Sequence, residues 1–164
     1  MGERIMDIGV ITSINVNPDG GVPKYPIDTT KLTINGVEGD KQRYKNHGGI
    51  ERAVALYSLE KILELQKEGH PIYPGSTGEN ITIKGLDWNS LQEDDQLEMG
   101  NVVIQLTFPA IVCNTIKESF INNNVNQMDS DINPGWARWY ASVVNEGNIS
   151  VGDTVRLTNI QDVL

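Results

Sequence analysis

The alternation of apolar and polar side chains along the chain predicts a protein built mainly from short strands. Several segments show this alternation, or a short run of Ile, Val and Leu between turn residues: 8–16, 31–35, 53–57, 79–83, 97–99, 102–108 and 154–157. Such patterns are typical of half-buried strands. The segments on either side of Gly100 and Asn101 also predict a hairpin. Many short strands joined by glycine-rich turns favour a mostly β fold, either a barrel or a sandwich.

Three short helices are predicted between these strands. The first begins at Ser58, with Leu59, Ile62 and Leu63 on one face, and ends before Gly69. The second begins at Thr115, where Thr and the Glu three residues later fit a capping box. The third follows Pro134, and its apolar face consists of Trp136, Trp139, Tyr140, Val143 and Val144. Spacings of three and four along this face are typical of an amphipathic helix packed on a core.

Length and composition predict a single domain over residues 1–164. The chain is 38% hydrophobic and has a net charge of -9, which argues against nucleic acid as a partner. It contains no apolar run long enough to cross a membrane, and its first residues lack a secretory core. A single cysteine cannot form an intramolecular disulfide. We therefore expect a cytoplasmic protein that has no membrane partner and must bind any anion through a local site.

Cys113 is the strongest candidate for chemistry. It lies between the strand at 102–108 and the helix predicted from Thr115, where the positive end of a helix dipole would favour the thiolate. A thiolate suits a soft metal ligand or a sulfur nucleophile. One Cys and two His without paired spacing argue against zinc, and the chain has no phosphate-loop or dinucleotide fingerprint for a nucleotide. The alternative is that Cys113 is a small buried hydrophobe.

Two glycine-containing segments are further candidates for a binding site. A locally basic segment contains His47, Gly48, Gly49 and Arg52, and its paired glycines would let the backbone approach an anion. The second segment, 75–80, is polar and leads into a predicted strand. Without other information these segments are better explained as a solvated loop with a tight turn and an ordinary hairpin turn.

Taken in order, the motifs of this chain resemble the MOSC domain, a module found at the C-terminus of molybdenum-cofactor sulfurases and as small stand-alone proteins. The matching residues are Gly39-Asp40, His47-Gly48-Gly49, Ala53-Val54, Tyr57, Pro74-Gly75, Gly78-Glu79-Asn80, Cys113, Gly147 and Gly152-Asp153. They follow the order and the spacing of that family over nearly the whole chain. The resemblance implies a mostly β barrel with a few helices, in agreement with the strand pattern.

The resemblance also implies a function centred on Cys113. In the leading hypothesis Cys113 gives its thiolate to the molybdenum of bound molybdopterin, and the protein reduces N-hydroxylated compounds with electrons from a separate donor protein. Residues 47–52 would contact the pterin and its phosphate, together with Gly78, Glu79 and Asn80. We expect Cys113 to open into a cleft between the turn at residues 47–49 and this second loop.

The chain departs from the family pattern near Cys113. The family often has Pro-Arg-x-Pro-Cys, whereas this chain has Ala110 in place of the arginine and Val112 in place of the second proline. Ser142 stands where the family commonly has another arginine, although Arg138 lies four residues earlier. We expect Arg52 and Arg138 to supply the missing positive charge to an anion site.

Three other functions remain open at this stage. Cys113 could carry a persulfide, which would make the protein a sulfur carrier that works with a sulfur-donor protein. Cys113 could be the nucleophile of a hydrolase or transferase, with His47 or His70 as its base. The third alternative is a degenerate member of the family that has lost its chemistry and acts by interaction, for example as a homodimer.

Overall fold

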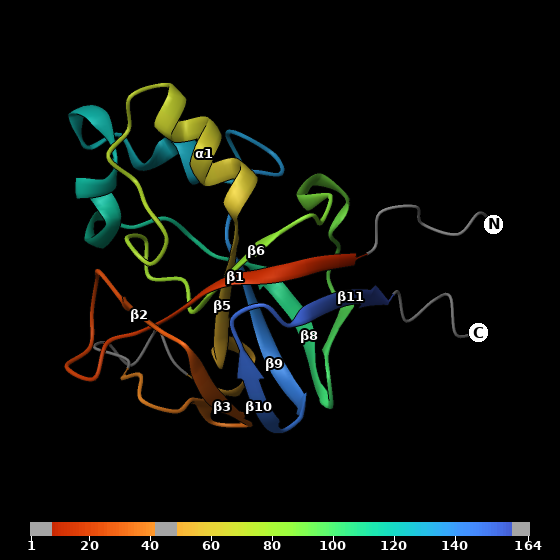
Figure 1. The fold of residues 1–164 in the computed structure, drawn as a ribbon. Coiled ribbons are helices and arrows are strands. Elements are labelled where there is room, and N and C mark those ends of the chain that lie inside the picture. The colour runs from red at the N-terminus through yellow and green to blue at the C-terminus, as the bar shows by residue number, and fades with distance from the viewer. Residues whose placement is uncertain (1–7, 42–48, 159–164) are drawn as a thin grey trace.

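The computed structural model describes residues 8–41 and 49–158, and strands dominate these ranges (Figure 1). The strands are β1 (Ile8–Val16), β2 (Tyr25–Ile27), β3 (Thr29–Thr33), β4 (Gly36–Val37), β5 (Val54–Ser58), β6 (Ile81–Lys84), β7 (Gln96–Met99), β8 (Val102–Pro109), β9 (Trp139–Asn145), β10 (Gly147–Ser150) and β11 (Thr154–Thr158). The helices are α1 (Leu59–Lys67) and the short 3-10 helices η2 (Ile50–Arg52), η3 (Trp88–Ser90), η4 (Asn114–Ser119), η5 (Ile121–Asn123) and η6 (Val125–Met128). None of the helices within the described ranges has the length and apolar character that crossing a bilayer requires.

Seven of the described strands close into a barrel. The sheet order is β11-β7-β8-β9-β5-β6-β1, and β11 also pairs with β1, which closes the ring. The closing pair is antiparallel, with Gly9 opposite Val155. The pair β5 and β6 is parallel, with Leu56 opposite Ile81, and α1 lies in the connection between these two strands. The predicted mostly β barrel is therefore confirmed.

The two ends of the barrel differ. Figure 1 shows α1 and the 3-10 helices η4 to η6 gathered at one end, whereas β3 and β10 lie at the other. A small sheet in the order β10-β3-β4 forms this second end, and Ile149 lies opposite Thr30 in it. The buried side chains Leu32 and Ile149 join this sheet to the main core.

The apolar core follows the alternation that the sequence shows. Its completely buried members on the barrel strands include Ile11, Ile14, Leu56, Ile81, Leu97, Ile104, Leu106, Ala141 and Val155. Full burial of a Leu or Ile side chain contributes about 1.5–3 kcal/mol relative to exposure. Burial of these alternate residues on strands far apart in the sequence therefore stabilises the closed barrel.

The first predicted helix is confirmed, with a different buried face. Ser58 is the N-cap of α1, and its hydroxyl accepts a hydrogen bond from the Lys61 N–H at 3.2 Å. The buried side chains are those of Ile62 and Leu65, whereas Leu63 is 48% exposed. Ile62 and Leu65 are three residues apart and so lie on one face.

The third predicted helix is wrong, because residues 139–145 form strand β9. Trp139, Ala141 and Val143 are buried and alternate with more exposed residues, which is the period of a strand. The four-residue spacing from Trp139 to Val143 fits a helix and a strand equally well. Pairing with β5 and β8 on both sides decides the outcome.

The second predicted helix is a 3-10 helix without the expected capping box. Helix η4 begins after Cys113, and no side chain makes a cap hydrogen bond there. The Thr115 hydroxyl lies 2.7 Å from Cys113 Sγ instead of capping the backbone. Ile116 and Ser119 are buried with a spacing of three, which matches the 3-10 period. The sequence predicted that an α-helix dipole would favour the Cys113 thiolate, but a 3-10 helix of six residues does not supply such a dipole.

Candidate functional site

Arg138 links the two segments that carry the main site candidates. Its carbonyl accepts a hydrogen bond from the Ala110 N–H at 2.8 Å, just before the chain reaches Cys113. Its side chain is 6% exposed, and Nη1 donates to the Thr77 carbonyl at 2.6 Å. Arg138 therefore holds the segment leading to Cys113 beside the loop at 75–80. It does so from the residue preceding β9, and not from a helix as the sequence predicted.

Cys113 lies in a partly exposed segment. The side chain is half-buried, and the neighbouring Ile111 is 78% exposed. Helix η4, which begins after Cys113, is joined to the loop at 75–80 because the Ser119 hydroxyl donates to the Ser76 hydroxyl at 3.0 Å. Cys113 is thus not the fully buried hydrophobe of the alternative interpretation. Its segment is fixed at both ends, by Arg138 and by Ser119.

Gly78 lies close to two buried cations. Its φ of +88° is a conformation that L side chains rarely adopt. A Cβ added at Gly78 would lie 3.0 Å from Val22 Cγ1, 3.9 Å from Lys24 Cε and 4.0 Å from Arg138 Nη1. Only glycine therefore fits without displacing its neighbours, and the backbone here lies close to both Lys24 and Arg138.

Glu79 is completely buried, and only one of its carboxylate oxygens has a hydrogen-bond partner in the part of the chain that the structure describes. Oε1 accepts from the Gly75 N–H at 3.0 Å and from the Thr77 hydroxyl at 3.3 Å. Among the described residues, Glu79 Oε2 and Arg138 Nε have no hydrogen-bond partner. Burial raises the pKa of Glu79 to about 7, although its hydrogen bonds and the charge of Arg138 oppose this shift.

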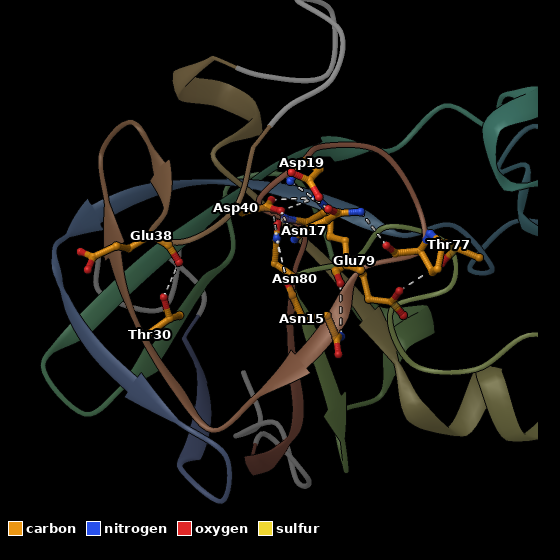
Figure 2. Close-up of polar contacts among 12 residues, drawn as sticks. Asn15, Asn17, Asp19, Thr30, Glu38, Asp40, Thr77, Glu79 and Asn80 are labelled. Atoms are coloured by element: carbon orange, nitrogen blue, oxygen red, sulfur yellow. Dashed lines mark hydrogen bonds and ion pairs between the residues drawn. The ribbon is translucent and has the colours of Figure 1, made fainter.

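The side chain of Asn80 is committed to a buried polar network (Figure 2). Lys24 Nζ lies 2.7 and 2.8 Å from the two oxygens of Asp40. Asp40 also accepts hydrogen bonds from the Asn17 N–H at 2.8 Å and from Asn80 Nδ2 at 2.9 Å. Asn80 Oδ1 in turn accepts from the Ala55 N–H at 3.0 Å. The network joins β1 and β5 to the loop at 75–80.

Sequence reasoning missed Lys24. Its side chain is 6% exposed, and it forms a buried ion pair with Asp40. The available signal was Asp40 itself, which belongs to one of the matching motifs. A buried carboxylate in an acidic chain needs a cation, but the sequence does not show which one reaches it.

Arg52 occupies a different environment from Arg138. It ends η2, which follows Gly49 with a φ of +102°. Its guanidinium carbon lies 5.2 Å from the ring centre of Phe108 and 5.5 Å from that of Tyr140. Arg52 therefore makes cation–π contacts with β8 and β9, whereas it is Arg138 that bonds to the loop at 75–80.

Of the two histidines considered as a base for Cys113, the structure describes only His70. His47 and Gly48 lie outside the described residues, so the predicted border of the cleft at 47–49 and the His47 base stay predictions. His70 is buried, and its Nδ1 accepts a hydrogen bond from the Ile121 N–H at 3.1 Å. Its Nε2 lies 3.8 Å from Glu68 Oε2. Among the described contacts, both ring nitrogens of His70 thus face groups other than Cys113.

The family follows from comparison of the whole chain with known proteins. The family model for the MOSC domain matches residues 43–156, which is more than half of the chain. The chain therefore belongs to the MOSC domain family, as its ordered motifs indicated. MOSC domains are in general associated with molybdenum-cofactor binding.

Individual relatives share about a quarter of their residues with this chain. YflK of Bacillus subtilis (strain 168) is 27% identical over 141 residues, which cover 84% of this chain and 62% of YflK. A protein of Gibberella moniliformis (strain M3125 / FGSC 7600) named "Reductase" is 29% identical over 127 residues, 74% of this chain and 22% of that protein. The chain thus spans less than two thirds of either relative. The crystal structure of YiiM from Geobacillus stearothermophilus matches with a TM-score of 0.71 at 22% identity, over 92% of this chain and 75% of that one, and it supports the fold.

Proposed function

We propose that this protein binds the molybdenum cofactor, with the Cys113 thiolate as a ligand of molybdenum, and reduces N-hydroxylated compounds. The observation that carries the proposal is the half-buried Cys113 thiol, held through Arg138 beside the loop at 75–80. Family membership and a relative named as a reductase support it. Reduction of an N–OH group to N–H consumes two electrons and two protons and releases water, so the proposal includes a separate electron-donor protein.

The residues present fit such a cofactor. A thiolate is a soft ligand suited to a transition metal, and Cys113 is the one cysteine of the chain. The guanidinium of Arg138 suits a phosphate group, because its buried Nε has no hydrogen-bond partner among the described residues. The arginines that the family pattern places at Ala110 and Ser142 are absent, and Arg138 supplies a cation from another position. Lys24 also lies near Gly78, but its charge is balanced by Asp40.

Each group then has a distinct task. When bound, the cofactor supplies a metal that exchanges electrons with the donor protein and the substrate. The Cys113 thiolate anchors it, and Arg138 balances the charge of its phosphate. The hydrogen bonds from Gly75 and Thr77 to Glu79 keep the loop at 75–80 in place. Arg52, with Phe108 and Tyr140, forms a second cationic surface that we propose as a contact for the cofactor.

Molybdenum and pterin analysis tests this function. We expect protein purified from a cofactor-synthesising host to contain both. Arg138→Ala should retain at least about tenfold less molybdenum and pterin than wild type, because a charge-assisted hydrogen bond contributes about 1.5–3 kcal/mol. Arg138 is buried, so the variant also loses stability. Ile149→Val, at a buried position of β10 in the small sheet, is the destabilised control and should retain both molybdenum and pterin. Wild-type protein that reduces N-hydroxylated compounds without molybdenum would refute the proposal.

A further inference from the structure

Two buried polar atoms beside one loop lack hydrogen-bond partners among the described residues. They are Oε2 of Glu79 and Nε of Arg138, whose side chains are 0% and 6% exposed. Nearly all buried polar atoms in native proteins are hydrogen-bonded, so such exceptions often mark a place where a ligand or a proton binds. Both side chains also contact Thr77. Glu79 accepts a hydrogen bond from the Thr77 hydroxyl, and Arg138 donates one to the Thr77 carbonyl.

Arg138 is the cation with bonding capacity to spare. A guanidinium has five N–H donors, and the described hydrogen bonds of the Arg138 side chain use only the Thr77 carbonyl. Lys24, which also lies near Gly78, is bound to both oxygens of Asp40. The charge that an anion meets beside Gly78 is therefore set by Arg138 and by the protonation of Glu79.

The other elements packed around Glu79 bring no further net charge. From β5, the buried Tyr57 donates its hydroxyl to the Trp136 carbonyl, and burial raises its pKa, so it stays neutral. From β1, the neutral Asn15 amide donates to the Glu79 carbonyl at 3.3 Å. Ser119 of η4 reaches the same loop through Ser76. Arg138 is therefore the charge that favours the carboxylate form of Glu79, in agreement with its effect on the Glu79 pKa.

We propose that the guanidinium of Arg138 binds a tetrahedral oxyanion and that Glu79 takes up one proton from solvent when this anion binds. The anion cancels the field of Arg138 at Glu79 and repels the carboxylate, and both effects favour the neutral acid. In the proposed function the oxyanion is the phosphate group of the cofactor, and to that extent the inference rests on that function. A free inorganic oxyanion has the same chemistry.

Sulfate is a suitable probe because it remains a dianion throughout the neutral pH range. With a Glu79 pKa of about 7 in the free protein, binding at pH 7 takes up about half a proton. Above pH 7 the sulfate affinity should fall by about tenfold per pH unit, and well below pH 7 it should level off. Glu79→Gln is always neutral and should bind sulfate with an affinity that does not depend on pH.

The experiment is isothermal titration calorimetry of the full chain, purified without cofactor, in buffers of different ionisation enthalpy. Wild type should show proton uptake, Glu79→Gln none, and the exposed control Glu93→Gln the wild-type value. Sulfate that fails to bind wild type, or that binds Arg138→Gln equally well, overturns the anion site. Binding without proton uptake in wild type overturns the role of Glu79, and this readout requires no variant to fold.

Molybdenum analysis separates this inference from the proposed function. Proton-coupled sulfate binding by a protein that never retains molybdenum or pterin would support a site for free oxyanions and would refute the cofactor proposal. Retention of molybdenum, with no proton uptake on sulfate binding, would support the cofactor proposal and refute the role of Glu79. Proton-coupled sulfate binding, together with molybdenum retention that is lost in Arg138→Gln, assigns the site to the phosphate of the cofactor.

Discussion

Asp40→Asn should lower the free energy of unfolding by about 3–5 kcal/mol, because it leaves the buried ammonium of Lys24 without its counter-charge. Asp40 accepts four hydrogen bonds, two from Lys24 and one each from Asn17 and Asn80. The Asn side chain in this variant has one acceptor oxygen and an NH₂ group in place of the second oxygen. The NH₂ group is a donor and would face the donors that Asp40 accepts from. Urea unfolding followed by circular dichroism measures the loss.

Asp28→Asn is the control for this prediction, because Asp28 is exposed and the same change should cost less than about 0.5 kcal/mol. Equal unfolding midpoints for Asp40→Asn and wild type would show that the Lys24–Asp40 pair does not stabilise the folded protein.

Glu79→Gln should remove a pH dependence of stability. The folded-state pKa of Glu79 is about 7 and its ordinary value is 4.5, so the folded state binds the proton more tightly. The resulting stability is fully present below about pH 4.5 and is lost as the pH rises through 7. Between about pH 5 and about pH 8 the unfolding free energy of the wild type should fall by about 2–3 kcal/mol through Glu79, and that of the variant should not show this fall.

The measurement is the difference in unfolding free energy between wild type and Glu79→Gln across this pH range, since other groups contribute equally to both proteins. Glu93→Gln, at an exposed position, should follow the wild type. A constant difference between wild type and Glu79→Gln would mean that Glu79 does not titrate in this range.

The barrel could be predicted because its strands carry their own signal. Strand β1 spans Ile8–Val16, as the Ile and Val pattern indicated, and the β7–β8 hairpin follows from the turn at Gly100 and Asn101. Strand β9 was mistaken for a helix because Trp139 and Val143 fit both periods over so few residues. Pairing with β5 and β8, which are distant in sequence, decides between them.

The site could be predicted only in part. Arg138 was a candidate on charge grounds, but its contacts with Ala110 and Thr77 depend on the ends of β8 and β9 coming together. Lys24 was missed because its partner, Asp40, lies sixteen residues away. Glu79 Oε2 and Arg138 Nε, which lack partners within residues 8–41 and 49–158, have no sequence signature, because a missing hydrogen bond depends on how the whole loop packs.

The most direct test of the central claim is X-ray absorption at the molybdenum edge on wild type and Cys113→Ser, both produced in a cofactor-synthesising host. We expect molybdenum in wild type to have one more sulfur neighbour than in the variant, or the variant to retain no molybdenum. Cys113 is half-buried, so the variant should fold and allow the comparison. Cys113→Ser with full molybdenum content and an unchanged number of sulfur neighbours would contradict Cys113 as the ligand.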